Sequence, residues 1–136
     1  MLSSVRLLTI ATLALAAAGC GDLSHDELNR RIETLRSVAG EAQLLAQDVA
    51  RDRTKITFVR VHGAELSDDV EHEQEKMADA TPAPGEGARL ERASAIGDDI
   101  ATAIDGLRTA PRDREQARSA AATLRKSSSQ LDELLR

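Results

Sequence analysis

The sequence predicts an all-α protein that folds as an antiparallel, up-down four-helix bundle. The chain of 136 residues has one Phe and neither Tyr nor Trp, whereas the residues that enter helices at little cost, Ala, Leu, Glu and Arg, are abundant. Apolar residues recur at steps of three and four in four separate segments, which is the period of one helical face. The connections between these segments are short, as in bundles whose successive helices run in opposite directions.

The first helix is predicted over residues 25–51. Ser24 and Glu27 form a capping box at its start, and Asp26 adds negative charge to the first turn. The apolar positions that step by four and three along it are Leu28, Ile32, Leu35, Ala39, Ala42, Ala46 and Val49.

The second helix is predicted over residues 55–80. The phase of the apolar pattern changes between Arg51 and Thr54, yet no Gly or Pro marks a turn there. One uninterrupted helix over residues 24–80 therefore remains an alternative. The inward positions of the second segment are Ile56, Val59, Gly63, Leu66, Val70, Glu73, Met77 and Ala80.

Pro and Gly punctuate residues 81–87, which we interpret as a linker. A third helix is predicted over residues 88–109, and a fourth over 111–135 with Pro111 as its first residue. The inward positions of the third are Leu90, Ala93, Gly97, Ile100, Ile104 and Leu107; those of the fourth are Ala117, Ala121, Leu124, Ser128, Leu131 and Leu135.

The charge of the chain is weakly acidic and unevenly distributed. A formal net charge of −5 and the lack of aromatic stacking residues argue against nucleic-acid binding. One stretch of the second helix is acidic (Glu65, Asp68, Asp69, Glu71, Glu73, Glu75, Asp79), and the last helix is basic (Arg112, Arg114, Arg118, Arg125, Lys126). These two helices could be complementary neighbours, or both could present solvated faces.

Glu73 is the one acid that falls within an apolar stripe, between Val70 and Met77. A buried carboxylate needs a partner. Arg92 or an arginine of the last helix could provide it, but we expect Glu73 to lie at a frayed helix end near the linker, in contact with water.

The N-terminus carries the signature of export. Arg6 precedes a run of 12 apolar residues, Leu7–Ala18, and small residues come next, which is the layout of a secretory signal. Twelve helical residues span about 18 Å, short of the roughly 30 Å of a bilayer core, so a spanning helix is not expected. An ordinary secretory signal, cleaved nearby, would leave Cys20 as a free thiol.

A lipoprotein signal is the interpretation that we favour. The segment Leu15-Ala16-Ala17-Ala18-Gly19-Cys20 resembles the lipobox of bacterial lipoproteins, although Ala17 stands where that pattern more often has Leu. The resemblance covers about the first 20 residues. It implies that residues 1–19 are a cleaved signal peptide, and that Cys20 carries a diacylglyceryl thioether and an N-acyl group such as palmitate. Residues 20–24 would then be a short tether, and residues 25–136 a domain outside the cytoplasm on the cell membrane or outer membrane.

One face of the second helix is a candidate metal site. His62, Glu65, Asp69 and His72 follow one another at spacings of three, four and three residues, which places them on the same side of the helix. Imidazole and carboxylate groups bind divalent transition metals. His62 and His72 lie about 15 Å apart along the axis, so a single ion could not bind both. The alternative is a solvated polar face.

No catalytic motif is recognisable, so we do not expect an enzyme. The leading hypothesis is a membrane-anchored helical interaction or structural module of the cell envelope, with membrane lipid and an unidentified envelope protein as partners. The second hypothesis is a metal-binding or metal-sensing lipoprotein that uses the His/carboxylate face.

Overall fold

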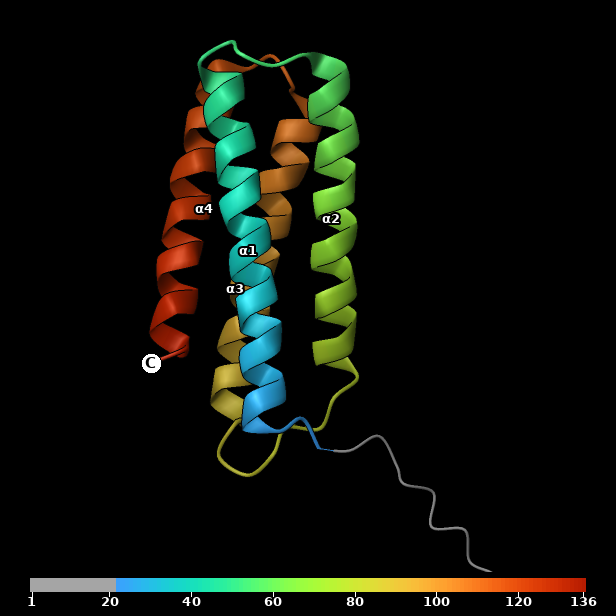
Figure 1. Cartoon of the computed structure of the whole chain (residues 1–136), viewed down its shortest axis with the longest axis vertical. Helices are drawn as coiled ribbons and strands as arrows, with labels where there is room; N and C mark the ends of the chain where they lie inside the picture. The colour runs from blue at the N-terminus through green and yellow to red at the C-terminus, as the bar shows by residue number, and fades with distance from the viewer. Residues whose placement is uncertain (1–21) are drawn as a thin grey trace, which may run out of the picture.

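Four helices account for the regular secondary structure of residues 22–136, the part of the chain that the computed structural model describes. They are α1 (His25–Ala50), α2 (Ile56–Ala78), α3 (Gly87–Thr109) and α4 (Arg114–Leu134). The prediction of an all-α, four-helix protein is confirmed. Figure 1 shows the connections between successive helices at alternating ends of the bundle. Each helix packs against its neighbours in sequence, and α1 also packs against α4, whereas α2 and α4 do not touch.

The start of α1 is capped as predicted: the Ser24 hydroxyl accepts from the Glu27 amide (3.2 Å).

The turn between α1 and α2 is the one that the sequence does not signal. The chain reverses there at Asp52, which adopts a left-handed conformation (φ 56°). Asp takes up this conformation more readily than most residues, because its short polar side chain can bond locally. The alternative of one helix over residues 24–80 is therefore wrong.

The start of α4 also differs from its prediction. Pro111 lies in the preceding turn rather than at the first helical position, and the helix begins at Arg114. Asp113 is the N-cap: its Oδ1 accepts from the amides of Glu115 (3.0 Å) and Gln116 (2.9 Å). The first amides of a helix have no acceptor within the helix, and the Asp113 carboxylate supplies one, which a proline side chain cannot do. The spacing of Asp113 and Gln116 is a capping pattern that could have located this start from the sequence.

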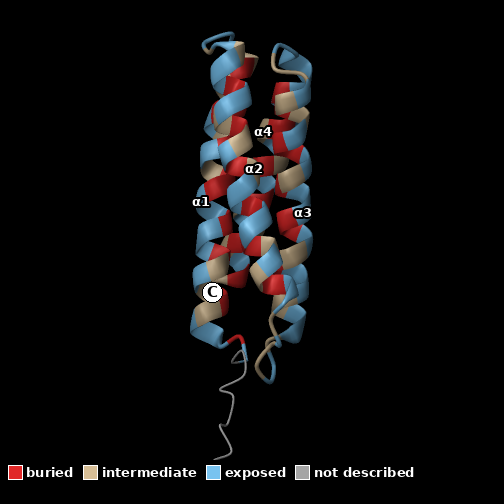
Figure 2. Cartoon of the chain, turned by 90° about the vertical axis from the view of Figure 1, so that its right-hand side faces the viewer, coloured by how far each residue is buried: buried red, intermediate tan, exposed pale blue. Residues whose placement is uncertain are grey.

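Buried residues lie on the faces that the helices turn toward one another (Figure 2). On α1, every predicted inward residue is buried. On α4, three predicted positions are displaced by one residue: Ala120, Ser127 and Leu134 are buried, whereas Ala121, Ser128 and Leu135 are only partly so. Each displaced pair consists of two identical residues, so hydropathy alone could not choose between them.

Glu73 is buried and paired, contrary to our expectation that it would be in contact with water. Its Oε2 accepts from Arg31 Nη1 of α1 (3.3 Å), and its Oε1 lies 3.7 Å from Lys76 Nζ. Arg31 also pairs with Glu27 (3.2 Å). The partner is thus on α1 rather than at Arg92 or on the last helix, because α1 and α2 are neighbours and α2 and α4 are not.

Two glycines inside helices make a matched test of packing. A Cβ added at Gly40 of α1 would meet no atom within 4 Å, whereas one at Gly63 of α2 would lie 2.7 Å from Arg108 Cγ. We expect Gly40→Ala to raise the free energy of unfolding by about 0.5–1 kcal/mol, since alanine restricts the unfolded chain and favours the helix. Gly63→Ala should lower it by about 1–3 kcal/mol, because Arg108 must be displaced from a packed position. Urea denaturation of the two variants checks both signs, and a gain at Gly63 would contradict the packing described.

Candidate functional site

The base of the bundle holds the segment that leads to Cys20. Leu23 is buried, its amide donates to the Thr81 carbonyl (2.7 Å), and its own carbonyl accepts from Ala83 (3.1 Å). Leu23 and Pro82 thus form an isolated parallel bridge between the start of the described chain and the α2–α3 connection. Leu23, which lies within the predicted tether of residues 20–24, is thus held against the base of the bundle. Cys20 itself and the predicted signal peptide lie outside the described residues.

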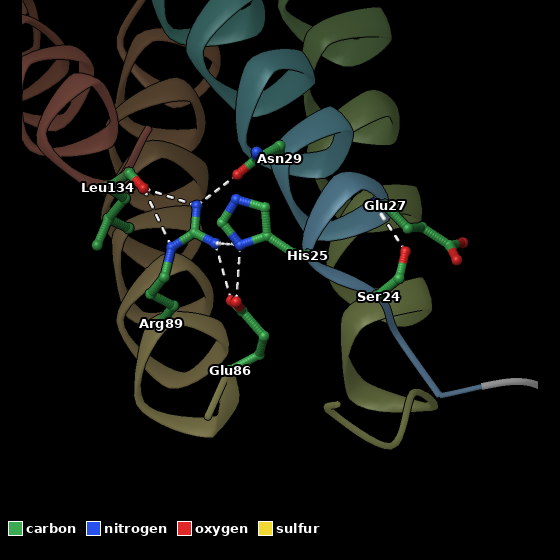
Figure 3. Close-up of polar contacts among 7 residues, drawn as sticks. All are labelled: Ser24, His25, Glu27, Asn29, Glu86, Arg89 and Leu134. Atoms are coloured by element: carbon green, nitrogen blue, oxygen red, sulfur yellow. Dashed lines mark hydrogen bonds and ion pairs between the residues drawn. The ribbon is translucent and has the colours of Figure 1, made fainter. Parts of the chain in front are cut away.

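Arg89 of α3 organises the polar contacts at this end (Figure 3). Its guanidinium donates to Glu86 Oε2 (2.8 Å), to Asn29 Oδ1 of α1, and to the Leu134 carbonyl at the end of α4 (2.6 and 3.1 Å). His25 Nδ1 lies 2.7 Å from the other oxygen of Glu86. The hydrogen bond with His25, and then the one from Arg89, lowers the pKa of Glu86 below its usual value. These contacts join the starts of α1 and α3 to the end of α4.

The predicted metal-binding face is only partly assembled. His62 is half-buried, its Nδ1 lies 3.3 Å from Glu65 Oε2, and its ring stacks on Phe58 with centroids 5.2 Å apart. The structure adds Glu41 of α1, whose Oε2 is 4.0 Å from His62 Nε2. Asp69 and His72 are exposed and have no hydrogen bond or ion pair among the described side chains. Within residues 22–136, no group of three or more His, Cys, Asp or Glu side chains is arranged to hold a metal ion.

A basic groove runs between the C-terminal part of α1 and the N-terminal part of α4. We use the name basic groove for the cavity of about 590 Å³ lined by Gln43, Gln47, Ala50, Arg51, Arg114, Arg118, Ala121, Ala122 and Arg125. Four of its lining residues are arginines, and none of the lining residues that the structure describes is acidic. Arg114 is held in place because its Nε donates to the Ala50 carbonyl at the end of α1 (3.1 Å).

The groove arginines have no carboxylate partner. Across the described range, no Asp or Glu oxygen lies within 4.0 Å of Arg51, Arg114, Arg118 or Arg125, whereas Arg31, Arg36, Arg53 and Arg89 all form ion pairs. Other described arginines, such as Arg60 and Arg92, also have no ion pair, but the groove brings four of them to one cavity. The possibility that the basic last helix neutralises the acidic stretch of the second is wrong, because α2 and α4 do not touch. The sequence showed the basic character of α4, but the second wall of the groove comes from α1.

The groove lies at the end of the bundle away from Leu23. The groove residues 43–51, in α1 and its C-cap, are 18 to 26 positions beyond His25, the first residue of α1, which corresponds to about 27–39 Å along the helix axis. Figure 1 shows the same end of the bundle carrying the α1–α2 and α3–α4 connections. The segment leading to Cys20 thus lies at one end of the molecule, and the groove arginines extend from the opposite end to the middle of α4.

Comparison with known proteins adds no assignment: no family model, no curated protein and no solved structure matches the chain. Within the described residues, no helix is both long enough and apolar enough to cross a bilayer.

Proposed function

We propose that this chain is a lipid-anchored protein of the bacterial cell envelope whose helical bundle is a non-catalytic interaction module. The anchor is Cys20, and the domain stands outside the cytoplasm on the cell membrane or the outer membrane. Each methylene of an acyl chain that enters the bilayer contributes about 0.8 kcal/mol, and two chains are enough for stable attachment. An anchor of this kind requires no spanning helix.

The observation that carries the interaction role is the basic groove, at the end opposite the anchor segment. Buried contacts hold Leu23 against the base, so only Gly21 and Asp22 separate Cys20 from the folded domain. With so short a connection, the bundle is held near the membrane, and a surface about 27–39 Å further along α1 is well placed to meet a second protein. Metal binding is not part of the proposal, since the described residues gather no set of three ligands.

Lipid attachment is tested by metabolic labelling with an alkyne analogue of palmitate. We expect the wild-type chain to incorporate the label and the mature protein to begin at Cys20, as read by mass spectrometry. Cys20→Ser should abolish both, because serine has no thiol to form the thioether. Leu44→Ala, an exposed position on α1, is the matched control and should label like wild type. Label retained in Cys20→Ser would refute the anchor.

The interaction role is tested in cells that carry the anchored protein. A photo-reactive amino acid placed at Ala122, in the groove, should form a protein adduct on illumination; the same residue placed at Asp105, an exposed position on α3, is the control. We expect an adduct at position 122 that is lost when Arg118→Gln is added. Equal adducts at both positions, or none at 122, would contradict a docking role for the groove.

A further inference from the structure

We infer that the basic groove binds a short acidic segment of a partner polypeptide, whose carboxylates pair with the arginines of both walls. This inference rests on the proposed function, because it names the kind of partner that the interaction module takes.

The arginines form a row of positive charge that the described chain leaves uncompensated. Arg114, Arg118 and Arg125 follow one another at spacings of four and seven residues on α4, so the row rises by about 6 Å and then about 10 Å. Arg51, at the end of α1, adds charge from the opposite wall. Like charges four residues apart destabilise a helix, as at Arg114 and Arg118. A bound anion reverses that effect and gains charge-assisted hydrogen bonds.

The rest of the lining favours a polypeptide over a simple polyanion. Ala50, Ala121 and Ala122 contribute apolar surface to the lining, and Gln43 and Gln47 offer amide groups that both donate and accept. A peptide can use all three kinds of surface: its main chain bonds to the glutamines, its aliphatic carbons contact the alanines, and its carboxylates accept from the guanidinium forks. A phosphate polymer would leave the alanine side chains and the carbonyl oxygens of the glutamine side chains without partners.

The length of the groove sets the length of the segment. Arg114 and Arg125 are separated by about 16 Å along α4. An extended chain advances about 3.3 Å per residue, so about five residues span the row. The inferred ligand is therefore a stretch of about five residues with acids near both ends.

The acidic stretch of a second copy is a less suitable occupant. The groove arginines run from the end of the bundle remote from Leu23, at Arg51 and Arg114, to the middle of α4 at Arg125, whereas the acids from Glu65 to Asp79 continue along α2 toward the other end. Two copies anchored to the same membrane would place most of these acids nearer the bilayer than the arginines.

The experiment measures fluorescence anisotropy with the full-length lipidated protein in non-ionic detergent micelles. The probe is a labelled peptide of alternating glutamate and alanine, and its control has glutamine at each glutamate. We expect Arg118→Gln and Arg125→Gln each to raise the Kd about tenfold, since each removes charged hydrogen bonds. Arg60→Gln and Arg92→Gln, exposed arginines on α2 and α3, should change it less than about twofold if the site is local to the groove.

Three results would overturn the inference. The first is an equal loss of affinity in the Arg60 or Arg92 variants, which would indicate diffuse charge attraction. The second is tighter binding of inorganic tripolyphosphate than of the peptide at the same salt concentration, which would make the ligand a phosphate polyanion. The third is a dimer in sedimentation that Arg118→Gln dissociates, which would make the occupant a second copy.

The outcomes also separate this inference from the proposed function. Lipid labelling and a groove adduct without peptide binding would refute only the acidic-segment ligand. Peptide binding without lipid labelling would refute the anchor and leave the ligand in place. Since the substituted arginines lie at the surface, thermal melts of each variant should coincide with wild type, and this establishes that any lost binding is not lost folding.

Discussion

Leu124→Ala is expected to lower the free energy of unfolding by about 2–5 kcal/mol. Leu124 is completely buried on α4, at the face that meets α1 and α3. The core cluster that contains Leu124 includes several alanines, among them Ala39, Ala42 and Ala46 of α1, a helix that packs against α4. Short side chains cannot reach into the space that a lost leucine leaves, so the cavity term adds to the lost transfer free energy.

The matched control is the same substitution at Leu44, a residue of α1 that is 63% exposed. Leu44→Ala should change the free energy of unfolding by less than about 0.5 kcal/mol, because an exposed side chain gives up little on truncation. Urea denaturation followed by circular dichroism compares the two. Similar losses at both positions would mean that α4 does not pack with Leu124 inward.

Glu73→Ala is expected to cost about 1–3 kcal/mol. The variant leaves the Arg31 guanidinium without its carboxylate partner on α2. The cost should be below the roughly 3–5 kcal/mol of a fully buried pair, because the Arg31 side chain is 23% exposed and retains Glu27. Denaturant titration at neutral pH measures the difference.

The double variant Arg31→Met with Glu73→Leu separates the charge from the packing. Replacing both charges removes the unpaired cation and fills the site with apolar atoms, so stability should return to within about 1 kcal/mol of wild type or exceed it. A double variant as unstable as Glu73→Ala would show that the ion pair itself, rather than the avoidance of an unpaired charge, stabilises the α1–α2 contact.

The two ends of the bundle differ in how their polar side chains are paired. The base is closed by Arg89 and by the Leu23 bridge, which use side chains and main chain to fix the starts and ends of three helices. The far end keeps several arginines uncompensated.

The four helices, most of their inward residues and the capping at Ser24 could be predicted from the sequence alone. Helix period, the Pro/Gly linker and a side-chain cap are local signals, written in residues that are close along the chain. Every helix boundary lies within two residues of its prediction, except the start of α4, where Asp113 caps a helix that begins three residues after the predicted first residue.

The contacts between these helices could not be predicted from the sequence and follow from the tertiary structure. The choice of Ala120 over Ala121 and of Ser127 over Ser128 could not come from residue type, because the members of each pair are identical. The partner of Glu73, the contact of His62 with Glu41 and the second wall of the basic groove all come from residues distant in sequence. Such contacts depend on how helices are ordered around a shared core, and periodicity gives the inward face of each helix but not its neighbours.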